Sequence, residues 1–232
     1  MSMVLFGVAV VLVSRLPREA LPATVVRSRS LADVWTELRE GWYLIVHDGP
    51  LALATLQLTA VSAAGVLLSM LAPGLAWRMF GARVSDIAYM IVPVGVGFGL
   101  GLALVGNWGG RLSRTRWICA GLISFSLSLA ILSLVRGWGW WVLPLLVAAA
   151  VGIGLGFALV NVPARTILQE RPPREMRGRV LATQWTLANA ANSLPLPLAG
   201  ALTDSVGITR MIFLLAICLL GMGIASKRYA AT

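Results

Sequence analysis

The segment "WWVLPLLVAAAVGIGLGFALVNVPARTILQERPPREMRGRV", residues 140–180, contains both features that decide the fold. Its first part, residues 140–163, has no charged side chain. At about 1.5 Å per residue, a helix of that length crosses the roughly 30 Å of hydrocarbon in a bilayer. Its last part, residues 169–180, holds four arginines, two glutamates and two prolines. An apolar run followed by a short charged run predicts a membrane-spanning helix and the loop after it.

The composition extends this interpretation to the whole chain of 232 residues. It is 58% hydrophobic and 12% charged, with a mean hydropathy of +0.85, whereas soluble domains are about 45–50% apolar and about 25% charged. Apolar runs predict an all-α, polytopic membrane protein with six transmembrane helices, at about 51–73, 85–106, 117–135, 140–163, 179–201 and 209–226. Membrane lipids are therefore an expected partner.

The remaining segments are assigned by length and charge. Residues 1–14 contain an apolar stretch, Met3–Val13, which is too short to span a bilayer and lacks the features of a signal peptide. We expect it to be the tail of a truncated transmembrane helix. Residues 15–50 are predicted to be an aqueous connector with an amphipathic helix over Leu31–Ile45 and Ser30 as its N-cap. Residues 227–232 form the predicted C-terminal tail.

The basic residues predict the orientation. Fifteen of the 19 Lys and Arg lie on one side of the predicted membrane, and four lie in loops on the other side. The fifteen fall in the connector, in the 107–116 loop, in the 165–178 loop with the adjoining Arg179, and in the C-terminal tail. The positive-inside rule places the richer side and both termini in the cytoplasm, as in a multi-pass protein of the cell (inner) membrane. Although the net charge is +10, separate short clusters do not form the continuous patch of a nucleic-acid binder.

Several elements of the sequence resemble the C-terminal half of a twelve-helix major facilitator superfamily transporter, in the branch of macrolide-efflux and siderophore-export proteins. These elements are "LREGWYLIVHDGPL" (38–51), "GFALVNVPARTILQE" (156–170), "RPPREMRGRV" (171–180) and "LATQWTLANAANSLPLPLAGALTDSVG" (181–207). The resemblance implies one of two six-helix bundles, with substrate bound between them near the membrane midplane and access alternating by rocking. It implies a secondary active exporter of drugs, siderophores or other amphipathic small molecules, completed by an N-terminal six-helix half.

Polar side chains within the spans are the candidate substrate-cavity residues. On the first span they form one stripe, and on the fifth they fall within an arc of about 120° at 100° per residue. Polar groups at membrane depth tend to face a cavity or the protein interior, although hydroxyls also bond to the i−4 carbonyl of their own helix. Gln57 and Gln184 lie off these stripes and suit either packing or gating. The cavity candidates are Thr55, Thr59, Ser62, Asn161, Thr183, Thr186, Asn189 and Asn192.

Four arginines are candidates for a cytoplasmic gate: Arg111, Arg174, Arg177 and Arg179. Anchoring the topology is the minimum role of these side chains, and gating would be additional. In the 107–116 loop, "NWGGRLSRTR", the resemblance leads us to expect a Gly, Asp, Arg, Gly signature. The acidic residue is absent here, which argues against a carboxylate-to-arginine lock within that loop.

Three other functions are alternatives to transport by a half-transporter. An intramembrane enzyme is not expected, because the sequence has no Gly-x-Ser-x-Gly or His-Glu-x-x-His pattern and its acids and only histidine lie in loops or near span ends. Neither a metal site nor a cofactor is expected. A complete six-span protein that works as a homodimeric transporter, with a second copy as partner, or as a non-catalytic membrane component remains open.

Overall fold

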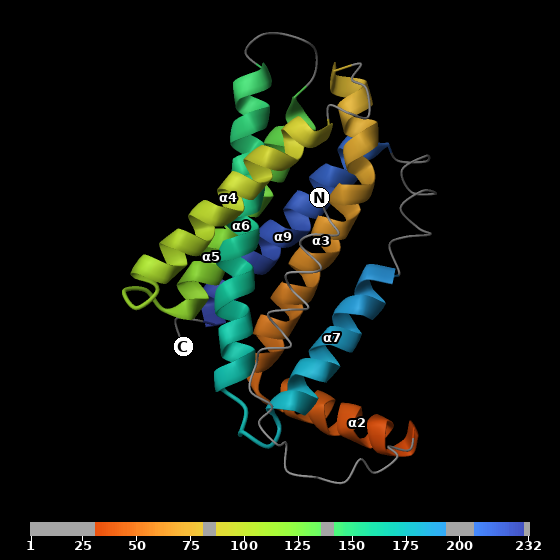
Figure 1. Cartoon of the computed structure of the whole chain (residues 1–232), viewed down its shortest axis with the longest axis vertical. Helices are drawn as coiled ribbons and strands as arrows, with labels where there is room; N and C mark the ends of the chain where they lie inside the picture. Colours follow the sequence, from red (N-terminus) through yellow and green to blue (C-terminus); the bar gives the residue numbers. More distant parts are fainter. Residues whose placement is uncertain (1–30, 81–86, 136–141, 194–206, 230–232) are drawn as a thin grey trace, which may run out of the picture. The chain divides into compact units, whose positions relative to one another are not determined.

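The computed structural model describes residues 31–80, 87–135, 142–193 and 207–229, and within them helices are the only regular secondary structure (Figure 1). The helices are α2 Leu31–His47, α3 Gly49–Phe80, α4 Ile87–Trp108, α5 Arg114–Leu134, α6 Val142–Glu170, α7 Arg177–Ser193 and α9 Ile208–Tyr229. The chain divides into two compact units, Met1–Thr36 and Glu37–Thr232, and the packing below concerns the second. The predicted helix tail at 1–14 and the Ser30 cap lie outside the described residues.

Within the described ranges, five helices are long and apolar enough to cross a membrane, as in a multi-pass membrane protein. They contain the candidate spans Gly49–Ala72, Ile91–Trp108, Arg114–Leu134, Val142–Glu170 and Ile208–Ser226. The remaining predicted span, 179–201, corresponds to α7 only as far as Ser193. The described part of α7 does not qualify as a membrane span by itself, and residues 194–206 lie outside the described part. The predicted six-helix bundle is therefore seen only in part.

Several helices extend beyond the predicted spans. The run 140–163 predicts an end at Pro163, but α6 continues through this proline to Glu170. Similarly, α3 covers Gly49–Phe80 where 51–73 is predicted. An apolar run marks the part of a helix that suits lipid, whereas the helical backbone can continue into polar residues, in α6 until just before Pro172 and Pro173. The predicted helix at Leu31–Ile45 is confirmed as α2, which extends to His47.

Four helices, α3, α6, α5 and α9, pack in a ring in which each contacts the next and α9 returns to α3. Large fully buried side chains such as Leu58, Phe125 and Ile212 fill its interior. α4 packs mainly on α6, and α7 packs on α3 and α6 (Figure 1). The ring therefore positions α7 beside α3, which brings the helices with the two predicted polar stripes together.

Glycines let α6 approach helices on two sides. Toward α4, a Cβ added to Gly154 would lie 2.8 Å from the amide nitrogen of Phe98. Toward α5, Gly121 and Gly156 face each other, so that a Cβ on Gly156 would lie 2.6 Å from the Gly121 carbonyl oxygen. Real side chains do not tolerate such distances, so these contacts require glycine, as expected for small-residue spacing in membrane helices.

Candidate functional site

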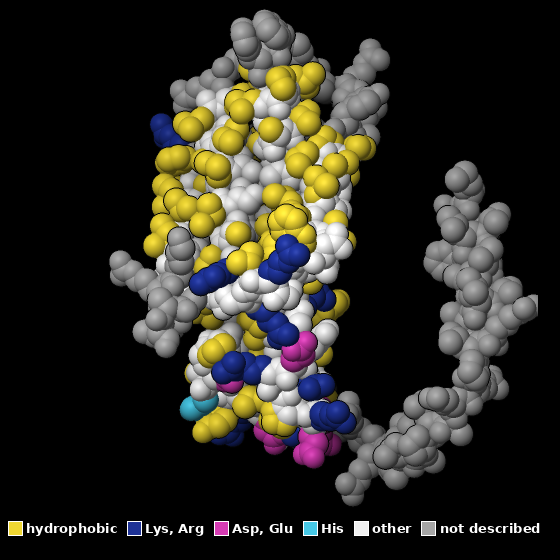
Figure 2. Space-filling model, turned by 90° about the vertical axis from the view of Figure 1, so that its left-hand side faces the viewer, with side chains coloured by type: hydrophobic (Ala, Val, Ile, Leu, Met, Phe, Trp, Pro, Cys, Tyr) yellow, Lys and Arg dark blue, Asp and Glu magenta, His cyan; other side chains and the backbone are white. Residues whose placement is uncertain are grey.

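Charged side chains gather at one end of the bundle, below a surface of mainly hydrophobic side chains (Figure 2). We call this region the charged end. It is where α2 leads into α3, α4 into α5, and α6 into α7 (Figure 1). Its ionic contacts involve Glu40, Asp48, Arg114, Glu170, Arg171 and Arg179.

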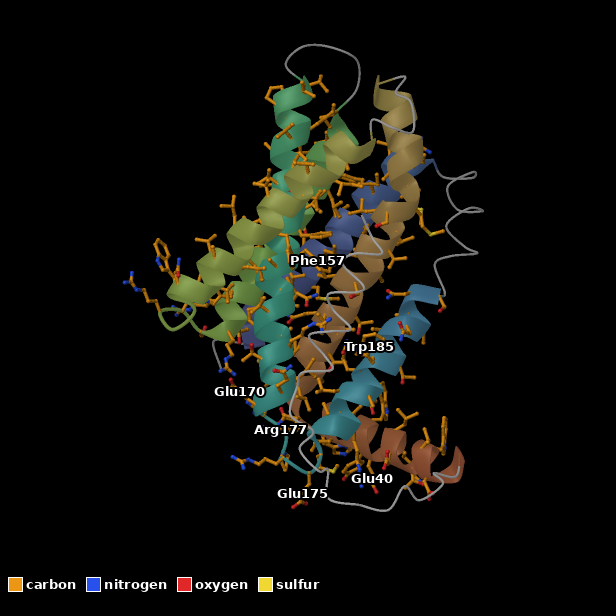
Figure 3. The ribbon with its side chains drawn as sticks, viewed as in Figure 1. Glu40, Phe157, Glu170, Glu175, Arg177 and Trp185 are labelled. Atoms are coloured by element: carbon orange, nitrogen blue, oxygen red, sulfur yellow. The ribbon has the colours of Figure 1, made fainter. Side chains whose placement is uncertain are left out.

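Three ion pairs connect the segment 170–179 to three other elements. Glu170 Oε2, at the end of α6, accepts a hydrogen bond of 2.6 Å from Arg114 at the start of α5. Arg171 bonds to Asp48, and Arg179 of α7 bonds to Glu40 of α2. Glu40 and Glu170 lie at the charged end in Figure 3. The charged residues of "QERPPREMRGRV" (169–180) therefore connect this loop, through ion pairs, to helices that are distant in sequence.

Asp48 has two structural roles. Its Oδ1 atom accepts a hydrogen bond of 3.3 Å from the Leu51 backbone N–H, which caps the N-terminus of α3. Both of its carboxylate oxygens also lie 2.8 Å from Nε of Arg171. The carboxylate is stabilised twice, because it faces the positive end of a helix and a guanidinium group.

The four predicted gate arginines have different surroundings. Arg179 forms the ion pair with Glu40, and Arg177 Nε donates a hydrogen bond of 3.2 Å to the Pro172 carbonyl oxygen. The Arg111 guanidinium lies 5.7 Å from the ring centroid of Trp108. Arg174 is exposed and makes no ionic contact within the described residues. Arg114, which falls in the predicted 107–116 loop, is the first residue of α5 and forms an ion pair with Glu170 at the end of α6.

Removing the charge of Arg171 should have a small and specific effect. Side-chain exposures of 49% for Arg171 and 29% for Asp48 place the pair among exposed ion pairs, so Arg171→Ala should lower the free energy of unfolding by about 0.2–1 kcal/mol. Asp48→Ala should cost about 1–2 kcal/mol because the helix cap is lost as well. Unfolding of the purified chain in detergent measures both.

Arg174→Ala, in the same loop, is the matched control and should leave stability unchanged. A double-mutant cycle between Asp48→Asn and Arg171→Ala isolates the ion pair. Additive effects of these two substitutions would show that the pair contributes nothing.

The exposed Arg174 also suits a test of topology. In a background without Cys119 and Cys218, Arg174→Cys should react with a thiol reagent only if that reagent crosses the membrane, because the loop is predicted to be cytoplasmic. Leu143→Cys, exposed at the opposite end of α6, should react with an impermeant reagent in intact cells. The reverse pattern would contradict the predicted orientation.

On α7, the predicted cavity hydroxyls bond mainly within their own helix. Thr183 and Thr186 donate to the carbonyls four residues earlier, at 2.8 and 2.9 Å. Thr183 is buried against α2, with its hydroxyl 3.3 Å from the Leu38 carbonyl oxygen, whereas Thr186 and Asn189 are exposed. Asn192 is partly buried and its Oδ1 has no hydrogen-bond partner among the described residues. Thr186 and Asn189 therefore form an outward face, and Thr183 belongs to the packing.

On α3, the predicted hydroxyls behave differently. Thr55 and Thr59 are 2% and 7% exposed, and neither hydroxyl oxygen has a hydrogen-bond partner within the described part of the chain. Ser62 is half-buried on the same stripe. A buried hydroxyl without a partner costs free energy, so Thr55 and Thr59 are candidates for contact with water or another molecule.

The third helix with a predicted cavity residue is α6. Its Asn161 is half-buried and Oδ1 accepts a hydrogen bond of 2.7 Å from Nε of Arg165, one turn later. The amide is thus held by a neighbouring charge on its own helix. The packing of α7 against α3 and α6 places the three helices with predicted cavity residues together, although it does not bring all eight residues onto one surface.

Sequence reasoning does not select Glu40, Asp48 or Glu170 as site residues. A local signal existed for Asp48, since an aspartate followed by Gly49 and Pro50 is typical of a helix start. Nothing local indicated that its partner is Arg171, 123 residues later. No protein-family model matches this chain, and no curated protein matches it either.

Proposed function

We propose that the chain is the C-terminal half of a secondary active transporter of the major facilitator type. It exports drugs, siderophores or other amphipathic small molecules by alternating access. The observation that carries this proposal is the outward polar face of α7, where Thr186 and Asn189 are exposed. This helix lies beside α3, which is long and apolar enough to cross a membrane.

The position of this polar face along α7 supports a cavity inside the membrane. Asn189 lies about 18 Å along the helix axis from Arg177, at about 1.5 Å per residue. If Arg177 is at the membrane surface, Asn189 is more than halfway through the roughly 30 Å of hydrocarbon. An amide that faces lipid at that depth lacks hydrogen-bond partners, so the face needs a water-filled cavity or a second bundle opposite it.

The chemistry of the face fits an amphipathic substrate. Trp185, 60% exposed, projects from α7 one residue before Thr186 and four before Asn189 (Figure 3). An aromatic ring offers an apolar contact area, while the hydroxyl and amide offer hydrogen bonds. The opposite wall of the cavity comes from the N-terminal six-helix half, in keeping with transporters that bind substrate between two repeats.

The charged end supports a rocking movement. The side chains in its three ion pairs are between 29% and 57% exposed, so each pair is weak enough to break and reform. These contacts hold α2, α3, α5 and α7 around the 170–179 segment. Arg179 and Arg177 serve as part of the cytoplasmic gate, with Arg111 and Arg174 available for contacts with the other half.

The proposal is tested by the reactivity of a cysteine on the α7 face. In a background without Cys119 and Cys218, Asn189→Cys in isolated membranes should react with a hydrophilic methanethiosulfonate reagent, because the face meets water. Leu127→Cys is the matched control, being 59% exposed and thirteen residues from the start of α5. Its thiol should stay unreactive in lipid. Equal reactivity at the two positions would refute the cavity at α7.

A further inference from the structure

A second polar feature lies inside the bundle, away from the outward face of α7. A partly enclosed pocket of about 140 Å³ lies between the start of α3, the start of α5 and the last turns of α6. Its walls are mainly apolar, and Gln57 provides its one carboxamide. The lining residues are Gly49, Pro50, Leu53, Ala54, Gln57, Thr115, Ile118 and Ile167.

Gln57 is unusual for a buried side chain. It is 1% exposed, and neither its amide oxygen nor its amide nitrogen has a hydrogen-bond partner among the described residues. A buried polar group without a partner is costly, and a carboxamide has both donors and acceptors to satisfy. Thr115 is the other lining residue with a polar side chain. The chain thus places an unsatisfied donor and acceptor in the wall of an apolar pocket.

The surroundings favour a neutral occupant. Two ion pairs hold the elements that line the pocket: Asp48, which caps α3, pairs with Arg171, and Arg114 of α5 pairs with Glu170 of α6. The residues that line the pocket are uncharged, and the two acids balance the two arginines in these ion pairs, so the described surroundings favour neither an anion nor a cation. A pocket of this size is similar to the cavity of about 150 Å³ that holds benzene in another protein.

We propose that this pocket binds one small neutral molecule with a hydroxyl or carboxamide group on a compact apolar body, about the size of phenol. The polar group of the ligand exchanges hydrogen bonds with the Gln57 amide, and the apolar body contacts Leu53, Ile118 and Ile167. A bound molecule joins the first turns of α3 to α5 and α6. It therefore strengthens the same connections that the two ion pairs make at the charged end.

The test compares phenol with toluene, which has the same number of heavy atoms but no hydroxyl group. The unfolding midpoint of the purified chain in detergent is followed at increasing probe concentration, and its shift gives an apparent affinity. Phenol should bind the wild type about tenfold more tightly than toluene, as a hydrogen bond to a buried amide predicts. Gln57→Met should abolish or reverse this preference.

Two further variants keep the test decisive. Gln184→Leu removes another buried glutamine, on α7 and outside the pocket lining, and should keep the wild-type preference for phenol. Ala54→Leu fills the pocket while leaving Gln57 intact and should abolish the shift with both probes. An equal phenol shift in the wild type, Gln57→Met and Ala54→Leu would show that the probe acts through the micelle, and the proposal would fail. It would also fail if phenol caused no shift in the wild type.

Discussion

Gly154→Ala is expected to destabilise the bundle by about 1–3 kcal/mol, the usual cost of overpacking a close contact. A methyl group at this position of α6 would lie 2.8 Å from the Phe98 amide nitrogen and closer still to the Val94 carbonyl oxygen of α4. These are backbone atoms, so the two helices must separate to make room. Because α4 packs mainly on α6, separation removes most of its contacts. Unfolding of the purified chain in a denaturing detergent measures the loss.

Two glycines of α4 provide a matched comparison for this prediction. Gly97 faces α6, and an added Cβ would lie 2.9 Å from Cα of Val151 and closer to its carbonyl oxygen, whereas Gly99 has nothing within 4 Å. Gly97→Ala should therefore destabilise. Gly99→Ala should be neutral or stabilise by up to about 1 kcal/mol, because alanine favours helix. If both substitutions had the same effect, the α4–α6 contact would not have the geometry described here.

The chain by itself is expected to show no transport driven by a pH gradient. Proton coupling needs a group that titrates while alternately exposed to the two sides, and within membranes Asp, Glu or His has this role. In the described part of the chain, Asp33 and Glu37 lie on α2, Glu40, Asp48 and Glu170 form ion pairs at the charged end, and Glu175 lies in the loop beside them. His47 bonds to the Tyr43 carbonyl oxygen at the end of α2. If the chain works as the proposed half-transporter, we expect the titrating carboxylate to come from the other half.

Reconstitution tests this expectation. The purified chain in liposomes with an imposed pH gradient should move no candidate dye, macrolide or siderophore faster than empty liposomes do. The full two-half assembly should move its substrate, and a proton ionophore should abolish that movement. Gradient-driven transport by the chain alone would contradict the prediction and favour the homodimer. The thiol test at Asn189 distinguishes a missing coupling group from a missing cavity.

The length and type of the membrane helices could be predicted from the sequence, because apolar runs and their charged flanks are local properties. Among the described residues, five helices can span a membrane and each overlaps one of the predicted runs, and α2 occurs where its amphipathic pattern indicates. The remaining predicted run, 179–201, is described only to Ser193, so the sequence remains its main support. Local pattern was least reliable at helix ends, as α6 shows by continuing past Pro163 to Glu170.

The helical period fixes the angle between residues on one helix but does not say which face meets a neighbour. The sequence places glycines at 95, 97, 99 and 101, and only the tertiary structure decides that Gly97 and Gly101 contact α6 while Gly95 and Gly99 do not. Likewise, the threonines of the two predicted stripes differ: those on α7 bond to carbonyls of their own helix, whereas Thr55 and Thr59 on α3 have no hydrogen-bond partner among the described residues. The sequence determined which segments are helical and apolar. Tertiary packing alone determined their partners, because those partners come from segments far apart along the chain.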